Sequence, residues 1–188
     1  SIGAWGTEGY DHTEDLPTGA IDLLGPIREL LNQAVAAGHG EEGIAADALD
    51  LVLDTGRILL SAEMLGGVQE CFERTIEYLK VREQFGVPIG SFQGLKHRAA
   101  QMFCEVELSK SVVLEALAAL DEDSEEIAEM DSLVKSRLND TYNLVSSEGV
   151  QMHGGIGMTD EYEIGFFMKR SRVCEHALGN SAFHRDRY

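Results

Sequence analysis

The chain has 188 residues, of which 44% are hydrophobic, and this is enough for one packed domain or one and a half. Its 33 acidic residues outnumber the 15 Lys and Arg residues and give a net charge of −18, which disfavours nucleic acid and anionic membrane as partners. The three cysteines are far apart and form no CxxC pair, which favours buried thiols in a reducing cytoplasm. No apolar stretch is long enough for a membrane span. The chain opens at Ser1 rather than at a methionine, which predicts that it begins inside a longer natural protein.

Helical periodicity dominates the sequence and predicts an all-α fold, an antiparallel four-helix bundle without a paired strand after residue 45. Residues 1–41 are expected to form an irregular lead-in with a short helix over 26–37, and residues 42–188 the bundle domain. The first long helix is expected to span about 42–82. Its apolar residues recur at helical spacing and predict one buried stripe, made of Leu49, Leu53, Leu60, Met64, Val68, Phe72, Ile76 and Leu79.

The remaining elements follow from turn and charge signals. The segment GVPIGS (86–91) predicts a turn, after which a second helix is expected over about 92–120. The acidic run 121–126 predicts a solvated loop that leads into a third helix ending near Met152. A shorter helical segment over about 160–169 and a basic tail complete the chain. The second helix is expected to bury Leu95, Ala99, Met102, Val106, Val113 and Leu117.

The glycine-rich end of the third helix is the first candidate for chemistry. The six histidines have no HExxH spacing, and no GxSxG motif is present, so neither a metal site nor a serine hydrolase is indicated. The stretch HGGIG (153–157) is not a dinucleotide fingerprint, because it follows a helix rather than a strand. Taken alone, GGIG is typical of a helix stop followed by a turn.

Cationic residues gather at two places in this acidic chain. Lys169, Arg170, Arg172, Arg185 and Arg187 place five of the fifteen cations in the last twenty residues. This either indicates a nearby anion such as phosphate or merely balances the charge of a helical tail. The second place is the corner REQFGVPIGSFQ (82–93), which combines a cation, two phenylalanines and an amide. Such a corner suits an aromatic heterocycle with a pyrophosphate, or it is simply a packed helix hairpin.

Two longer motifs carry a family resemblance. The stretch VREQFGVPIGSFQGLKHRAAQM (81–102), followed by GVQMHGGIGMTDEY (149–162), resembles the C-terminal helical domain of the acyl-CoA dehydrogenase family. The resemblance covers roughly residues 45–188. Members of this family are flavoproteins that remove a proton and a hydride from the α and β carbons of an acyl-CoA thioester, with FAD as the hydride acceptor. Their usual subunit also has an N-terminal helical domain and a middle β-domain, which this chain does not resemble.

The resemblance assigns the corner to the cofactor. It implies that Arg82 binds the FAD pyrophosphate and that Phe85 and Gln93 lie on the adenine side, with Gln84 as a further cofactor-binding position. These residues would meet FAD at a subunit interface, so the resemblance also implies an oligomer.

The glycine motif receives the same assignment. The resemblance implies that Gln151, Gly154 and Gly155 meet the ADP portion of a flavin from a neighbouring subunit. Glycine suits this role because a pyrophosphate can approach backbone N–H groups closely only where no Cβ intervenes.

The catalytic base is where the sequence departs from the family. Most members keep a catalytic glutamate directly before a Gly-Thr-Ser-like triplet, and the matching residue here is Leu178. A branch of the family places the base just before an arginine of the first long helix, and here Gly56 precedes Arg57. Neither residue can accept a proton. Glu175 lies one helical turn before Leu178 and is either a relocated base or a surface carboxylate paired with Arg172.

The sequence therefore predicts a C-terminal domain or small subunit of an FAD-dependent acyl-CoA dehydrogenase that lacks its own base. The expected partners are an acyl-CoA substrate, further subunits in a homo- or hetero-oligomer, and electron-transferring flavoprotein as the acceptor. No metal is expected, and the expected location is cytoplasmic. The alternative is a helical interaction module that keeps the fold and binds no flavin.

Overall fold

A computed structural model describes residues 42–122 and 124–188, with side chains from Leu49 onward. The expected lead-in and the short helix over 26–37 lie outside the described residues. The chain divides into two compact units, Ser1–Val52 and Leu53–Tyr188. Of the first unit, only the opening turns of helix α3 are described.

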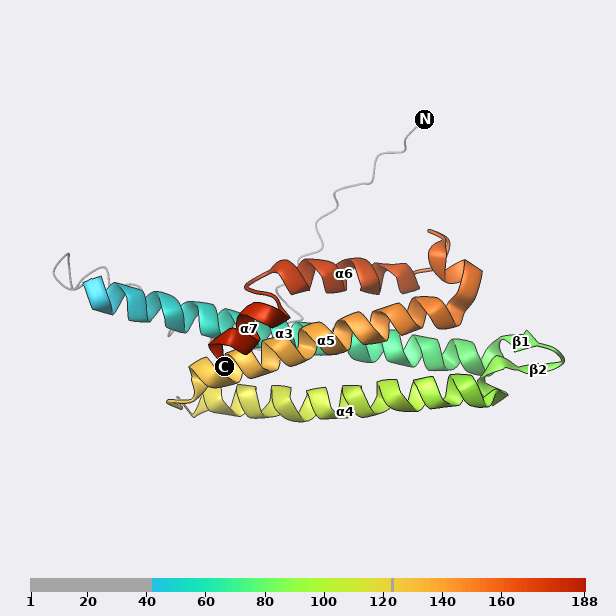
Figure 1. Ribbon diagram of the computed structural model, residues 1–188, viewed down its shortest axis with the longest axis horizontal. Coiled ribbons are helices and arrows are strands. Elements are labelled where there is room, and N and C mark those ends of the chain that lie inside the picture. The colour runs from blue at the N-terminus through green and yellow to red at the C-terminus, as the bar shows by residue number, and fades with distance from the viewer. Residues whose placement is uncertain (1–41, 123) are drawn as a thin grey trace, which may run out of the picture. The chain divides into compact units, whose positions relative to one another are not determined.

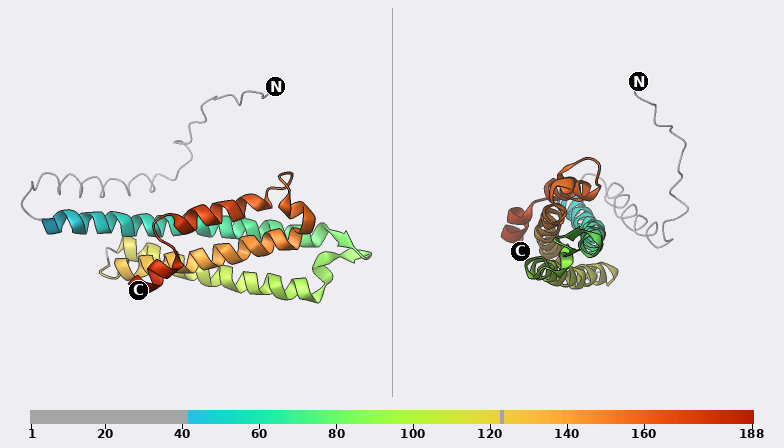
Figure 2. Two further views of the ribbon diagram at one scale, coloured as in Figure 1. Left: turned by 45° about the horizontal axis from the view of Figure 1, so that its top comes forward. Right: turned by 90° about the vertical axis from the view of Figure 1, so that its right-hand side faces the viewer.

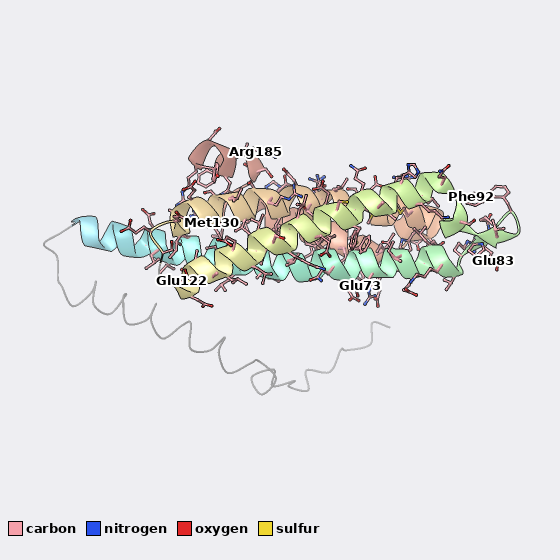
Figure 3. The ribbon with its side chains drawn as sticks, turned by 90° about the horizontal axis from the view of Figure 1, so that it is seen from below. Glu73, Glu83, Phe92, Glu122, Met130 and Arg185 are labelled. Carbon is pink, nitrogen blue, oxygen red and sulfur yellow. The ribbon has the colours of Figure 1, made fainter. Side chains whose placement is uncertain are left out.

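The second unit is built from helices that run antiparallel (Figures 1 and 2). Four long helices are followed by a short one, in the order α3 (Glu42–Val81), α4 (Gln93–Asp121), α5 (Ile127–His153), α6 (Ile164–His176) and α7 (Ser181–Arg187). Helix α5 is central, because it packs against α4 and also against α6 and α7. Figure 3 labels Glu83 and Phe92 at one end of these helices and Glu122 and Met130 at the other. The all-α four-helix prediction is confirmed.

The core lies along the inner faces of these helices and includes polar residues that the apolar pattern could not reveal. In α3, Met64, Val68 and Leu79 are buried as predicted, but Leu49 is 56% exposed. The stripe is wrong in the first half of α3 because part of the buried face there is polar. The buried polar residues of α3 are Asp54, Thr55, Arg57, Ser61 and Thr75.

The second helix agrees better with its pattern. In α4, Met102, Val106 and Val113 are buried, and the other three predicted residues are half-buried. Ser109 is also buried, where its hydroxyl donates to Thr141 of α5 over 2.9 Å. A polar pair inside the bundle is tolerated because each hydroxyl has a partner.

A small β-hairpin contradicts the prediction that no strands pair after residue 45. Strands β1 (Glu83–Gln84) and β2 (Val87–Pro88) pair antiparallel, and a short 3-10 helix, η1 (Ile89–Ser91), leads into α4. Phe85 and Gly86 form the turn with φ values of 55° and 79°. Two successive residues with positive φ are what a two-residue hairpin requires. A ladder of two residue pairs is too short to leave an alternating apolar pattern in the sequence, so it could not be predicted.

The C-terminal elements also differ from expectation at their boundaries. Helix α5 ends at His153, and the 3-10 helix η2 (Gly154–Met158) follows. Helix α6 starts at Ile164 and continues to His176, so the predicted segment 160–169 was placed too early. The basic tail forms α7, where the side chain of Asn180 accepts a hydrogen bond from the N–H of Phe183 over 2.9 Å and caps the helix. Within the described ranges, no helix has the length and apolar character needed to cross a membrane.

Candidate functional site

The corner predicted to bind the cofactor is the exposed end of α3 and its hairpin. Arg82, Gln84, Phe85 and Gln93 are all solvent-exposed, and the ring of Phe85 is 92% exposed. Phe85 meets Phe92 edge to face, with ring centroids 6.1 Å apart. An aromatic surface this exposed is not core packing, so the simpler account of a packed helix hairpin does not explain Phe85.

The structure gives a different account of the glycine at each position that follows α5. Gly154 has φ 66°, which favours glycine. A Cβ on Gly157 would lie 2.7 Å from the carbonyl oxygen of Val150, so that glycine is required by packing. At Gly155, φ is not positive and a Cβ would meet nothing within 4 Å. Gly154 and Gly155 are exposed, so their backbone is open to a ligand.

Tyr78 connects the corner to the glycines. Its hydroxyl donates to the carbonyl of His153 over 3.3 Å, and the two rings stack with centroids 4.2 Å apart. Tyr78 is one helical turn before Arg82, whose N–H donates to the Tyr78 carbonyl. The C-terminal ends of α3 and α5 therefore meet, and all seven predicted cofactor residues lie at this end of the bundle (Figure 1).

His153 is the unusual residue at this end. Its ring is buried, and Nδ1 lies 2.7 Å from the carbonyl oxygen of Gly149. Nε2 is buried without a hydrogen-bond partner, the one such side-chain atom in the described part of the chain. Burial lowers the pKa of His153, so the ring is neutral at pH 7. The exposed cation of Arg82 and the exposed backbone of Gly154 and Gly155 are groups suited to a pyrophosphate, whereas the buried Nε2 of His153 does not face solvent.

The two positions where the family keeps its base are brought together. Gly56 lies on α3, and Leu178 lies in the connection between α6 and α7. A Cβ on Gly56 would lie 3.5 Å from Cδ1 of Leu178. Leu178 has φ 60°, which is rare for a bulky residue, and its side chain is part-exposed. Neither residue can therefore accept a proton at this place.

Glu175 forms an ion pair with a neighbouring arginine. Its carboxylate accepts a hydrogen bond from Arg172 over 2.9 Å within the last turn of α6. This is the arrangement expected of a surface carboxylate rather than of a free base.

The basic tail forms ion pairs with this chain's own carboxylates. Arg170 pairs with Glu63, Arg185 with Asp140, and Lys169 lies 3.7 Å from Asp160. Arg172 and Arg187 are likewise paired within the chain. Of the two interpretations left open for the tail, charge balance accounts for the cations and no external anion is needed.

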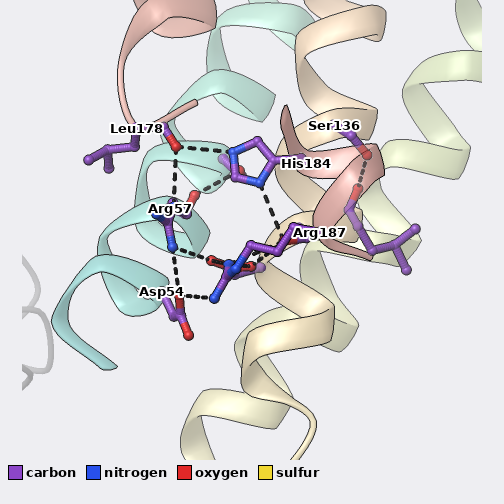
Figure 4. Close-up of polar contacts among 10 residues, drawn as sticks. Asp54, Arg57, Ser136, Leu178, His184 and Arg187 are labelled. Atoms are coloured by element: carbon purple, nitrogen blue, oxygen red, sulfur yellow. Dashed lines mark hydrogen bonds and ion pairs between the residues drawn. The ribbon is translucent and has the colours of Figure 1, made fainter. Parts of the chain in front are cut away.

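A buried polar cluster beneath Leu178 was not predicted (Figure 4). Arg57 donates to Asp54 over 2.6 Å and to Asp131 over 3.0 Å. Its Nε also donates to the carbonyl of Leu178 over 3.2 Å. Burial and the neighbouring Asp131 raise the pKa of Asp54. The only sequence signal for this cluster was the position of charged residues at helical spacing on an otherwise inward face.

A buried lysine holds the next residue of the same loop. Lys135 is fully buried, and its ammonium donates to the carbonyls of Cys174 and Gly179 over 2.8 and 3.1 Å. It also donates to Asn139 over 2.7 Å, so all three N–H groups have partners. Burial lowers the pKa of Lys135 to about 8. The loop through Leu178 and Gly179 is thus fixed by side chains of α3, α5 and α7.

Comparison with known proteins gives a consistent result. The model of the acyl-CoA dehydrogenase C-terminal domain matches residues 41–188. The acyl-CoA dehydrogenase IpdE2 of Mycolicibacterium smegmatis is 32% identical over 163 residues, which cover 87% of this chain and 48% of that protein. No group of His, Cys, Asp or Glu among the described residues could hold a metal ion.

Solved structures agree with these sequence matches. Butyryl-CoA dehydrogenase from Megasphaera elsdenii superimposes with a TM-score of 0.74 at 28% identity, over 78% of this chain and 38% of that one. A chain from the structure of the electron transferring flavoprotein of Acidaminococcus fermentans also gives a TM-score of 0.74 at 28% identity, over 79% of this chain and 39% of that one. The chain spans about half the length of IpdE2 and less of these structures.

Proposed function

Because the chain belongs to the acyl-CoA dehydrogenase family of oxidoreductases, we propose that it is the C-terminal portion or a small subunit of an FAD-dependent acyl-CoA dehydrogenase. In this role it contributes to FAD binding and to oligomer contacts, and it brings no catalytic base of its own. The observation that carries the proposal is the proximity of Gly56 and Leu178, since a Cβ on Gly56 would lie 3.5 Å from Leu178. Both positions of the family's glutamate meet at one place, and neither residue can be ionised.

The cofactor-binding end supports the role of FAD. Arg82 supplies a cation for the pyrophosphate, and Gln84, Phe85 and Gln93 extend the same exposed surface. At the end of α5, Gln151 and the open backbone of Gly154 and Gly155 face solvent. N–H groups without a neighbouring Cβ can approach phosphate oxygens closely. When bound, FAD supplies the hydride acceptor for α,β-dehydrogenation of an acyl-CoA thioester.

Because this chain is proposed to lack the base, another subunit or domain must supply it. Leu178 and Gly56 present an apolar surface where a proton acceptor would be needed. The α proton of the thioester must then pass to a carboxylate of another subunit or domain, since proton transfer needs a group within hydrogen-bond reach. We therefore propose a homo- or hetero-oligomer with other acyl-CoA dehydrogenase subunits. Electron-transferring flavoprotein is the proposed acceptor, supported by the match to a chain from the Acidaminococcus structure.

The second candidate function is a helical interaction module that keeps the bundle and binds no flavin. Exposure of Phe85 and an open Gly155 argue against it, because scaffolding alone gives neither residue a role. Purification with a partner subunit separates the two functions. A yellow complex with the visible absorbance of oxidised flavin supports the enzyme component, whereas a colourless complex that takes up no added FAD supports the module.

A substitution at Arg82 tests the site directly. In the assembled oligomer, Arg82→Ala is expected to weaken FAD binding by about 1.5–3 kcal/mol, the scale of a hydrogen bond to a charged group. Lys80→Ala is the matched control, because Lys80 lies in the last turn of the same helix and is paired with Glu77. FAD titration by fluorescence measures both variants. Equal affinity of the parent and Arg82→Ala would show that this end does not bind the pyrophosphate.

A further inference from the structure

The short helix α7 reaches into the buried cluster through its last arginine. Arg187 donates to Asp54 of α3 over 2.7 Å. It also donates to both carboxylate oxygens of Asp131 of α5, over 2.5 and 2.7 Å. Figure 4 shows Asp54 joined by dashed lines to both Arg57 and Arg187. One side chain therefore ties the C-terminal helix to two helices of the bundle.

The cluster is electrically balanced, and this makes Arg187 hard to replace. Two guanidinium groups, of Arg57 and Arg187, face the two carboxylates of Asp54 and Asp131. Asp131 is fully buried, so losing Arg187 would leave a buried carboxylate with half of its counter-charge. An uncompensated buried charge is strongly unfavourable, so α7 has one well-defined position.

The position of α7 determines where His184 lies. His184 is fully buried, and its Nε2 lies 3.0 Å from the carbonyl oxygen of Leu178. Arg57 donates to that same oxygen, so the Leu178 carbonyl has two N–H donors. These bonds hold Leu178 at φ 60°, a conformation that a leucine seldom adopts unaided. In this conformation its side chain lies against Gly56.

We propose that Arg187 and His184 are positioning residues that fix the side chain at position 178 against Gly56. The inference rests on the proposed function, which places the reacting carbons of the acyl-CoA thioester at this point. Arg187 acts through α7, and His184 acts through the carbonyl of Leu178. Neither side chain needs to touch the substrate, because both act by holding the loop that carries Leu178. Without the two residues, the surface formed by Leu178 and Gly56 loses its shape while the bundle remains.

The test uses the assembled, FAD-loaded complex and two pairs of variants. Arg187→Met removes the ion pairs. Arg185→Met is its control, because Arg185 lies on the same helix, α7, and makes an exposed pair with Asp140 of α5. His184→Leu removes one donor to Leu178 and the 3.4 Å contact with Ser132 but none of the four ion-paired side chains, and His184→Gln retains an N–H. For each variant we would measure the amide hydrogen exchange of residues 176–181, the Kd for butyryl-CoA by calorimetry, and the flavin content.

His184→Leu is expected to speed exchange in residues 176–181 by about tenfold, as after loss of one hydrogen bond, and Arg187→Met, which removes several bonds that hold α7, by at least as much. The Kd for butyryl-CoA is expected to rise by about fivefold or more, with flavin content and helicity unchanged. Arg185→Met and His184→Gln should stay within about twofold of the parent for both measurements.

Three results would overturn the inference. Parent-like exchange and Kd in His184→Leu would show that Leu178 is held without this donor. If Arg187→Met loses helicity and flavin while His184→Leu behaves like the parent, Arg187 is needed only for the stability of the fold. Equal effects of Arg185→Met and Arg187→Met would assign them to net charge. If the parent complex holds flavin but binds no butyryl-CoA, the proposed function fails at its substrate, and the exchange measurements still decide the positioning role.

Discussion

At the scale of single residues, Gly56 and Leu178 show how a motif and a structure constrain each other. Family resemblance identified both positions separately, and the structure brings them together, so that a Cβ on Gly56 would lie 3.5 Å from Cδ1 of Leu178. What the sequence could not predict is the conformation of Leu178, because a positive φ at a leucine depends on tertiary hydrogen bonds from Arg57 and His184. Under the proposed function, the loss of the base at position 178 is a local chemical change in a loop whose backbone is held by these hydrogen bonds.

Glu175 gives the first prediction at this scale. Because Glu175 is paired with Arg172 at the surface, Glu175→Gln is expected to change the rate of the assembled complex by less than about threefold, and its unfolding free energy by less than about 1 kcal/mol. Steady-state acyl-CoA oxidation and urea denaturation measure the two quantities. A rate loss of about a hundredfold or more would instead make Glu175 the general base.

Lys135 gives a pH prediction. Burial lowers its pKa from 10.5 to about 8 in the folded chain, so between these values the unfolded chain binds a proton that the folded chain has released. The unfolding free energy contributed by this site therefore rises with pH through that window, by up to about 1.4 kcal/mol per pH unit. Below about pH 8 both states are charged, and the site adds no slope.

The measurement compares the parent with Lys135→Met by urea denaturation between about pH 7 and about pH 10. Burial raises the pKa of Cys71 and of Tyr142 to about 12, which opposes the lysine effect, but both groups are common to the two proteins and cancel in the difference. Lys110→Met, at a surface ion pair with Glu107, should follow the parent. A difference that is independent of pH would show that Lys135 keeps its ordinary pKa.

At the scale of elements, helices were predictable and their inner faces only partly so. The apolar stripe of α3 succeeded at Met64, Val68 and Leu79, where the buried residues are apolar. It failed near Leu49, because Asp54 and Arg57 take inward positions that are stabilised by partners on other helices. The hairpin depended on two positive φ values rather than on periodicity. Local patterns therefore predict the elements, and long-range polar pairing sets their final rotation.

The glycines after α5 provide a prediction about elements. Gly157→Ala is expected to destabilise the fold by about 1–3 kcal/mol, because its Cβ would lie 2.7 Å from the Val150 carbonyl oxygen and the backbone must shift. Gly155→Ala has open space and should stay within about 0.5 kcal/mol of the parent. Denaturation midpoints compare the two variants. If both substitutions cost the same, the packing of η2 over α5 is not what requires Gly157.

At the scale of the whole molecule, the sequence motifs name the residues of the proposed cofactor end but not those of the cluster below Leu178. The two motifs are far apart in the chain, yet α3 and α5 end together because both run antiparallel to α4 and therefore parallel to each other, and Tyr78 joins their ends. The cluster of Asp54, Arg57, Asp131 and Arg187 could not be predicted, since each charge alone resembles a solvated residue. The chain spans about half the length of IpdE2, and the proposed function draws the rest of the active site from further segments or subunits.

The last prediction follows from that incompleteness. Taking a proton from the α carbon of a thioester needs a carboxylate within reach, and here the two candidate positions are Leu178 and Gly56. A missing general base costs about 10²–10⁴ in rate, so the chain alone is expected to show no measurable acyl-CoA oxidation, even with FAD supplied. It should also bind FAD weakly by itself, because the proposed site takes some of its residues from another chain. Activity should appear when a partner that carries its own glutamate is added, and should disappear when that glutamate is replaced by glutamine. Robust turnover by the purified chain alone would place the base within residues 1–188 and contradict the proposal, whereas activity that depends on the partner's glutamate would assign this chain to binding the flavin and shaping the site.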